Sequence, residues 1–126
     1  MHTHRHGHLA SAWRVRRDPM TGADRWTQLD RRDPRQAQSF YALDPSKTLT
    51  RGDRVAFRCT MMNFGSSFVR QGLASSDEMC DLYLLYYTEE GEGGAIEGPN
   101  FCWSEGLPAV TWKRLGFNNI PEEAKY

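Results

Sequence analysis

The alternation of apolar and polar positions along the first 90 residues predicts short β-strands separated by turns. Residues 9–17 mix apolar and polar positions in a strand-like way, and a shorter stretch of the same kind covers residues 25–29. Between them, residues 18–22 are Asp-Pro-Met-Thr-Gly, a composition typical of a turn. We therefore expect the two stretches to form a hairpin.

Three more strands are expected further along the chain. Residues 39–43 form a short strand candidate that ends at Asp44-Pro45, and residues 55–61 are the clearest candidate for a central strand. Residues 81–88 are rich in leucine and tyrosine, which predicts a strand buried on at least one face. Strands divided by turn signals, with little helical periodicity, indicate an all-β single domain, an antiparallel β-sandwich or jelly roll.

The character of the sequence changes after residue 88. Residues 89–94 are acidic and rich in glycine, as in a flexible linker. The tail from 95 to 126 carries two tryptophans and ends in residues 121–126, where a short helical turn is expected. We therefore expect one sandwich domain over residues 1–90 and a linker with a C-terminal tail over residues 91–126.

Length and charge exclude several classes of partner. A chain of 126 residues is long enough for one domain with a core of its own. Its 16 basic and 16 acidic side chains cancel, which gives no electrostatic reason to expect nucleic acid or an anionic membrane as partner. The longest apolar run, residues 82–87, is the length of a strand, and about 20 residues are needed to span a bilayer. No membrane segment is expected.

Histidines alternate with other residues at the start of the chain. If residues 2–4 form a strand, its period of two puts the imidazoles of His2 and His4 on one face, about 7 Å apart at the backbone. Two neutral imidazoles can hold one metal ion. A thioether such as Met79 is a soft ligand that suits copper, above all Cu(I). Two histidines and one methionine would therefore make a copper site able to change oxidation state.

Each of these residues also has a simpler interpretation. His6 and His8 continue the alternation, and four such histidines at a terminus are equally typical of a purification tag or an exposed metal-binding tail. Met79 precedes a cysteine and an apolar stretch, where a methionine usually fills a core. The three cysteines, Cys59, Cys80 and Cys102, are an odd number, so at least one is unpaired within the chain, and all three can be reduced thiols.

An ordered set of short motifs resembles one known family over roughly residues 2–90. The chain resembles the copper type II, ascorbate-dependent monooxygenases, and within them the second catalytic domain of the peptidylglycine alpha-hydroxylating enzymes. The motifs that carry the resemblance are His2-Thr3-His4, Gly7, Ser11, Arg14-Val15-Arg16, residues 38–41, Gly52-Asp53, Arg58-Cys59 and residues 75–83.

The resemblance implies a jelly-roll-type sandwich and a set of functional residues. It implies that one copper ion is held by His2, His4 and Met79, while His6 and His8 are surface residues. It implies a disulfide between Cys59 and Cys80, which would stabilise the fold by roughly 3 kcal/mol and requires an oxidising compartment. The positions of Asp81 and Tyr83 would hold the substrate, with plain aromatic packing as the alternative for Tyr83. Asp81 is an aspartate where asparagine is usual, and an anion there would repel a substrate carboxylate.

The implied activity is hydroxylation of an aliphatic C–H by O₂, with ascorbate as reductant, on a peptide or small-molecule substrate. No signal peptide is visible, whereas the resemblance implies the secretory lumen or the extracellular space. We therefore expect the chain to be a piece of a longer enzyme that lacks the N-terminal copper domain, and with it the partner of Cys102. Two alternatives stay open at this point: a non-catalytic copper-binding β-sandwich, and an interaction domain with a histidine tail.

Overall fold

The computed structural model describes residues 1–87 and 106–125. They form two small antiparallel sheets and two short helices, so the fold is mostly β. The larger sheet has the order β3-β2-β4, and the smaller one pairs β1 with β5. The elements are β1 (His2–Thr3), β2 (Gly7–Arg17), β3 (Asp24–Arg32), β4 (Arg54–Met61), β5 (Cys80–Asp81), α1 (Pro108–Arg114) and α2 (Glu122–Lys125).

The predicted hairpin is confirmed as β2 and β3, but the central strand is β2 and not residues 55–61. The Asp18 side chain caps the hairpin turn by accepting hydrogen bonds from the amides of Met20 and Thr21, and Gly22 has a φ of 69°, which a glycine adopts without strain. Within the described residues, β4 pairs only with β2, so it lies at the sheet edge. Apolar composition predicted its burial but not its number of neighbours.

Two other expected strands are absent or short. Residues 39–43 have no regular structure, and the Phe40 side chain is 67% exposed. The strand expected over residues 81–88 ends at Asp81, and residues 83–87 are exposed. A strand needs a neighbour to satisfy its backbone groups, and the described residues place no second strand beside residues 82–87. The expected jelly-roll arrangement stays a prediction.

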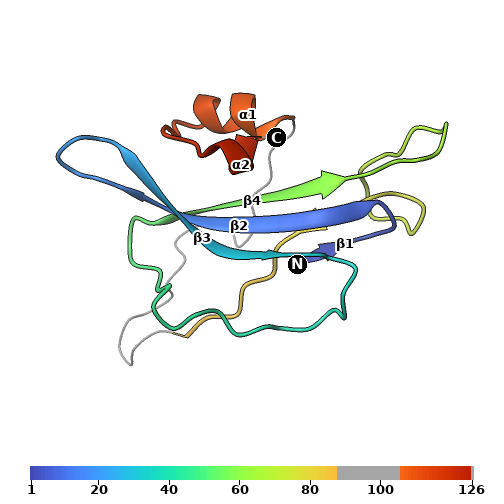
Figure 1. Cartoon of the computed structure of the whole chain (residues 1–126), viewed down its shortest axis with the longest axis horizontal. Helices are drawn as coiled ribbons and strands as arrows, with labels where there is room; N and C mark the ends of the chain where they lie inside the picture. Colours follow the sequence, from blue (N-terminus) through green and yellow to red (C-terminus); the bar gives the residue numbers. More distant parts are fainter. Residues whose placement is uncertain (88–105, 126) are drawn as a thin grey trace.

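One face of the three-stranded sheet carries the core. Figure 1 shows α1 and α2 stacked over this face. Trp13 and Val15 point into it from β2, and Trp112 of α1 packs edge to face on Trp13 with ring centroids 6.0 Å apart. Trp26 stacks on Trp112 at 5.5 Å. The buried core residues are Trp13, Val15, Ala56, Trp112, Ile120 and Ala124.

The C-terminal residues therefore add to the core of the sheet. The helical turn predicted at residues 121–126 is confirmed as α2, with Ala124 fully buried. The linker predicted at 89–94 and Cys102 lie outside the described residues. The division into a domain over 1–90 and a tail over 91–126 stays a prediction.

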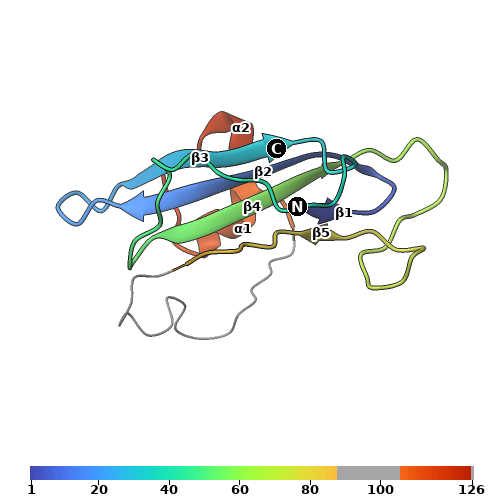
Figure 2. The same ribbon diagram turned by 90° about the horizontal axis from the view of Figure 1, so that it is seen from below.

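The opposite face of the sheet is tied to the loop over residues 33–53 and to the small sheet. Arg14 donates to the carbonyl oxygen of Thr48 at 2.8 Å, and Arg16 forms a two-point ion pair with Asp53. Cys59, on this side of β4, is joined to Cys80 of β5, which confirms the predicted disulfide. Figure 2 shows β1 and β5 side by side on this side of the sheet. The disulfide thus fixes the small sheet against the large one.

Candidate metal centre

The two-stranded ladder of β1 and β5 brings the start of the chain to residues 79–81. His2 lies opposite Asp81 and Thr3 lies opposite Cys80 in an antiparallel register. The same register, extended by one residue, places His4 opposite Met79. Residues directly opposite each other in an antiparallel pair share a face. Thr3 is buried against Gly7 and Cys80 is bonded to β4, so His2 and Asp81 share the other face of the ladder. That His4 and Met79 join them there stays a prediction.

The two imidazoles are close to each other, and one of them is held by a hydrogen bond. The ring centroids of His2 and His4 are 5.1 Å apart and the ring planes are nearly perpendicular, at 79°. Nδ1 of His4 lies 2.7 Å from the carbonyl oxygen of Asp77. A carbonyl oxygen only accepts, so Nδ1 carries the proton and Nε2 is left as a lone pair. That is the tautomer in which a histidine binds metal through Nε2.

The His2 ring has a partner of its own. Its Nδ1 lies 2.6 Å from the side-chain amide of Gln38, whose nitrogen and oxygen exchange places by a simple rotation. The atom that faces Nδ1 is Nε2 of Gln38, whose N–H donates to the ring; the rotated amide would accept from Nδ1–H instead. In the part of the chain that the structure describes, no hydrogen bond engages Nε2 of either His2 or His4.

A single buried carboxylate, that of Glu78, holds the backbone around these ligands. Its Oε1 accepts the amides of His4 and Met79, the latter at 3.1 Å, and its Oε2 accepts the amide of His6 at 2.7 Å. Burial raises the pKa of Glu78, but the three amide donors lower it more, and the net pKa lies below the usual value. The carboxylate is therefore ionised at neutral pH.

These residues fit copper better than zinc. Within residues 1–87 and 106–125, no three His, Cys, Asp or Glu side chains gather as a metal site. The ladder brings the two neighbouring imidazoles to the segment that carries Met79, whose side chain is half-buried. A thioether is a soft ligand that copper accepts.

The chain matches the family described as copper type II ascorbate-dependent monooxygenase, C-terminal domain, over residues 1–115. It belongs to this family. It is 37% identical over 125 residues to the mouse protein named peptidyl-glycine alpha-amidating monooxygenase, which covers 98% of this chain. It is 32% identical over 125 residues to form A of that enzyme from Xenopus laevis, and 38% identical over 90 residues, 71% of this chain, to the rat protein.

The chain spans only 9 to 12% of the length of these three relatives, so it corresponds to a small part of each. A comparison with solved structures gave no match. Among the described residues, no helix is both long enough and apolar enough to cross a membrane. The membership establishes a copper monooxygenase C-terminal domain.

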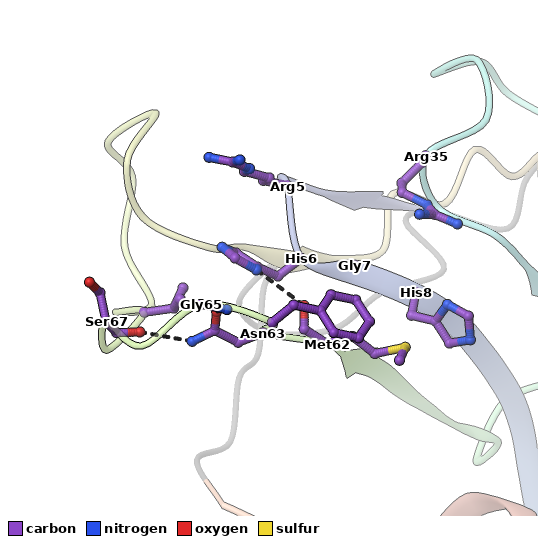
Figure 3. Close-up of a pocket in the computed structure, with 11 residues that line it drawn as sticks. Arg5, His6, Gly7, His8, Arg35, Met62, Asn63, Gly65 and Ser67 are labelled. Atoms are coloured by element: carbon purple, nitrogen blue, oxygen red, sulfur yellow. Dashed lines mark hydrogen bonds between the residues drawn. The ribbon is translucent and has the colours of Figure 1, made fainter.

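The other two histidines of the alternating set lie apart from the first two. His6 and His8 line a cavity of about 650 Å³ together with Arg5, Arg35 and Phe64. Figure 3 shows the two rings at different ends of this cavity, and Nδ1 of His6 is 3.1 Å from the carbonyl oxygen of Met62. None of the three predicted copper ligands lines the cavity. That the domain uses His2 and His4, and not His6 and His8, to bind metal stays a prediction.

The two predicted substrate residues occupy different environments. Asp81 is half-buried and directly opposite His2 in the ladder. Tyr83 lies beyond the end of β5 and is 60% exposed, so the structure does not bring it into the ladder. The shared strand face that was expected for Met79, Asp81 and Tyr83 therefore reaches only to Asp81, because the strand ends there.

Sequence reasoning missed the roles of Glu78 and Gln38. Glu78 and Gln38 were expected only as members of two matching motifs, residues 75–83 and residues 38–41. Neither has a spacing signal, because Gln38 is 36 residues from His2 and Glu78 is 74 residues from His4. One general rule could have drawn attention to Glu78. A carboxylate that is buried beside a proposed ligand nearly always accepts hydrogen bonds from nearby donors.

Proposed function

We propose that the chain is the oxygen-activating, substrate-binding domain of a peptidylglycine alpha-hydroxylating-type monooxygenase, with one copper ion on His2, His4 and Met79. The observation that supports the proposal is the antiparallel register of β1 and β5, which sets His2 opposite Asp81 and which, continued by one residue, would set His4 opposite Met79. Family membership supports copper as the metal and ascorbate as the reductant.

The chain's own residues have distinct roles in this proposal. The carbonyl oxygen of Asp77 and the rotated amide of Gln38 would hold the imidazoles of His4 and His2 at Nδ1 and leave both Nε2 atoms for the metal. The thioether of Met79 is a weak, soft ligand that favours the reduced form of copper. When bound there, copper supplies the one-electron chemistry with O₂ that hydroxylation of an aliphatic C–H requires.

Substrate binding is assigned to the same face of the ladder. Asp81 would hold a polar group of the substrate beside the metal, and Tyr83, exposed at the end of β5, would contribute its hydroxyl. Peptides ending in glycine are the first candidates. Because Asp81 is an anion, the site favours a substrate group that is neutral or cationic over a carboxylate.

The full reaction would need parts that lie outside this chain. The resemblance assigns electron storage to an N-terminal copper domain, with ascorbate as the source of electrons. The disulfide between Cys59 and Cys80 supports an oxidising compartment, the secretory lumen or the extracellular space. The family resemblance also supports a jelly-roll-type sandwich in the complete domain. Nucleic acid and membranes are not among the proposed partners.

The test is X-ray absorption of the Cu(I)-loaded chain beside three variants. We expect one copper per chain with nitrogen and sulfur scatterers, and loss of the sulfur in Met79→Ala. Met20→Ala is the matched control, because Met20 is 91% exposed in the hairpin turn and its loss should leave the spectrum unchanged. The double variant His6→Ala/His8→Ala should also retain copper.

The outcomes separate the alternatives. Nitrogen-only ligation that is unchanged in Met79→Ala and lost in His6→Ala/His8→Ala would mean that the histidine tail binds metal by itself. A copper–sulfur signal without catalysis would fit a copper-binding sandwich that is not an enzyme. That case is tested by adding a first copper domain from a relative and measuring ascorbate-dependent hydroxylation of a glycine-extended peptide. Product above background supports the enzyme.

A further inference from the structure

The carboxylate of Glu78 contacts the backbone of two proposed copper ligands, and no pattern in the sequence predicted these contacts. The carboxylate is 5% exposed and belongs to the residue just before Met79. It accepts three backbone amides, those of His4, His6 and Met79. Two of these amides belong to proposed ligands, one on each side of the site. A carboxylate accepting from several amides is a strong and directional interaction.

These contacts replace part of the missing ladder. The pairing of β1 with β5 consists of two residue pairs, His2 with Asp81 and Thr3 with Cys80. At the next position, the amide of His4 donates to Glu78 and not to a backbone carbonyl across the ladder. A two-residue ladder would be weak alone. The carboxylate therefore continues the connection between the strands where the ligands lie.

The backbone of the same segment also fixes the ligand ring. The carbonyl oxygen of Asp77 accepts Nδ1–H of His4 at 2.7 Å, so residues 77–79 hold His4 at its backbone and at its ring. A parallel bridge between Gln71 and Glu78 anchors the segment on its other side, with the Glu78 amide 2.7 Å from the carbonyl oxygen of Arg70. The anchor makes Glu78 part of a fixed support and not of a loose loop.

We propose that Glu78 is the positioning residue of the metal centre: its carboxylate holds His4 and Met79 in register with each other before any metal binds. The inference rests on the proposed function, since it takes His4 and Met79 as ligands. Loss of this carboxylate would leave both side chains present and chemically intact, but would separate the two strands that carry them.

The variant Glu78→Gln tests this inference with little change of shape. One of its terminal oxygens is replaced by an NH₂ group, which cannot accept a hydrogen bond. The variant therefore loses either the bond from the His6 amide or the two bonds from the His4 and Met79 amides. We expect Cu(I) affinity to fall at least tenfold, as is usual for outer-sphere partners of a metal, and the copper–sulfur scattering to weaken or vanish. The positions of the disulfide and of the tryptophan cluster should not change.

The matched control is Asp53→Asn, which also removes a buried carboxylate with several donors. Asp53 accepts hydrogen bonds from Arg16 and from the Thr50 amide at the end of the loop that precedes β4, and it contacts none of the proposed ligands. It should lower the free energy of unfolding without changing copper affinity or sulfur scattering. If copper affinity falls only because the fold is less stable, it should fall in both Glu78→Gln and Asp53→Asn. If Glu78 positions the ligands, copper affinity should fall in Glu78→Gln alone.

Three results decide between this inference and the proposed function. If the unmutated chain shows copper–sulfur scattering that Glu78→Gln retains at full affinity, the positioning role is wrong and the copper site stands. If the unmutated chain shows no sulfur, the copper site fails and the inference fails with it. If Glu78→Gln does not fold, hydrogen exchange in the metal-free chain decides: the inference requires slow exchange at the amides of His4, His6 and Met79, and fast exchange overturns it.

Discussion

Cys59 and Cys80 connect the two sheets one residue away from Met79. Cys59 lies on β4 of the large sheet and Cys80 on β5 of the small one, with their Cα atoms 5.8 Å apart. The strand that carries a proposed copper ligand is therefore attached covalently to the sheet that holds the core. Stability and metal binding are coupled through this bond.

Replacing both cysteines with alanine should weaken the fold and the metal site together. The bond closes a loop of 21 residues, and its loss should lower the free energy of unfolding by roughly 3 kcal/mol. Copper affinity should fall as well, because Met79 loses its fixed neighbour. Urea unfolding and a Cu(I) competition titration measure the two effects. A reductant should lower the free energy of unfolding and the copper affinity of the unmutated chain and should leave both values of the double variant unchanged. Equal copper affinity in the unmutated chain and the double variant would contradict the coupling.

Truncation of Trp112 should destabilise the whole chain. Trp112 of α1 is 5% exposed and contacts Trp13, Trp26 and Phe117 across the core. Trp112→Ala should cost about 3–5 kcal/mol in urea unfolding, because it opens a cavity beneath both helices. Val110→Ala, on the same helix at 48% exposure, should change stability by less than about 0.5 kcal/mol. A small effect of Trp112→Ala would mean that the helices are not part of the cooperative unit.

The buried carboxylate of Asp24 should make the chain sensitive to acid. Its side chain is fully buried and receives donors from Arg17, Arg54 and the Asn118 amide. Burial raises the pKa of Asp24, but these donors lower it more, from 3.8 to about 2. Since the folded pKa is the lower one, the stabilisation of about 2 kcal/mol is fully present above pH 3.8 and is lost as the pH falls towards 2.

Asp24→Asn should therefore show a flatter dependence of unfolding free energy on pH between about 2 and 4, measured by urea unfolding at each pH. Asp33 is a useful control, because its pKa is also lowered to about 2, chiefly by Arg35. Asp33 and Arg35 are exposed and only two residues apart in the sequence, so much of their interaction persists in the unfolded chain. Asp33→Asn should leave the pH profile almost unchanged, and an identical effect of both variants would count against the assignment.

Alanine at position 7 should displace the strand that bears the histidines. A Cβ on Gly7 would collide with the side chain of Thr3, which packs directly on the glycine. Gly7→Ala should cost about 1–3 kcal/mol in stability and reduce copper affinity, because β1 must move away from β2. Gly65→Ala, in the loop after β4, meets the Asn63 side chain at 3.3 Å and the Ser67 amide nitrogen at 4.0 Å, without a collision, and should behave like the unmutated chain. Unchanged copper binding in Gly7→Ala would show that the position of β1 is not critical.

Asp81 should set the preference for the charge of the substrate. Asp81 lies opposite His2 in the ladder that leads to the proposed copper ligands. The copper-loaded chain should bind a peptide with a C-terminal glycine amide more tightly than the same peptide with a free carboxylate. Asp81→Asn should shift that ratio several-fold towards the carboxylate, because a fixed negative charge is removed. Calorimetry on both peptides measures the ratio, with Asp44→Asn in an exposed loop as the control that should leave it unchanged.

Part of this fold could be predicted because it depends on neighbours in the sequence. The hairpin of β2 and β3 follows from alternating residues around an Asp-Pro-Met-Thr-Gly turn, and α2 from the short C-terminal turn. The resemblance added the pairing of Cys59 with Cys80, which the structure confirms. The strand expected at 39–43 is absent and the one expected at 81–88 ends at Asp81, because apolar composition does not supply a neighbouring strand.

The sequence by itself determined which chemistry this chain can offer: two alternating imidazoles, a thioether and a family of copper monooxygenases. Only the tertiary structure decided how those groups are held. Glu78 contacts His4 across 74 residues of sequence and Gln38 contacts His2 across 36 residues. Trp112 of α1 packs on Trp13 of β2, which is also far away in the sequence. Such contacts depend on chain reversal and burial in three dimensions, for which local spacing carries no signal.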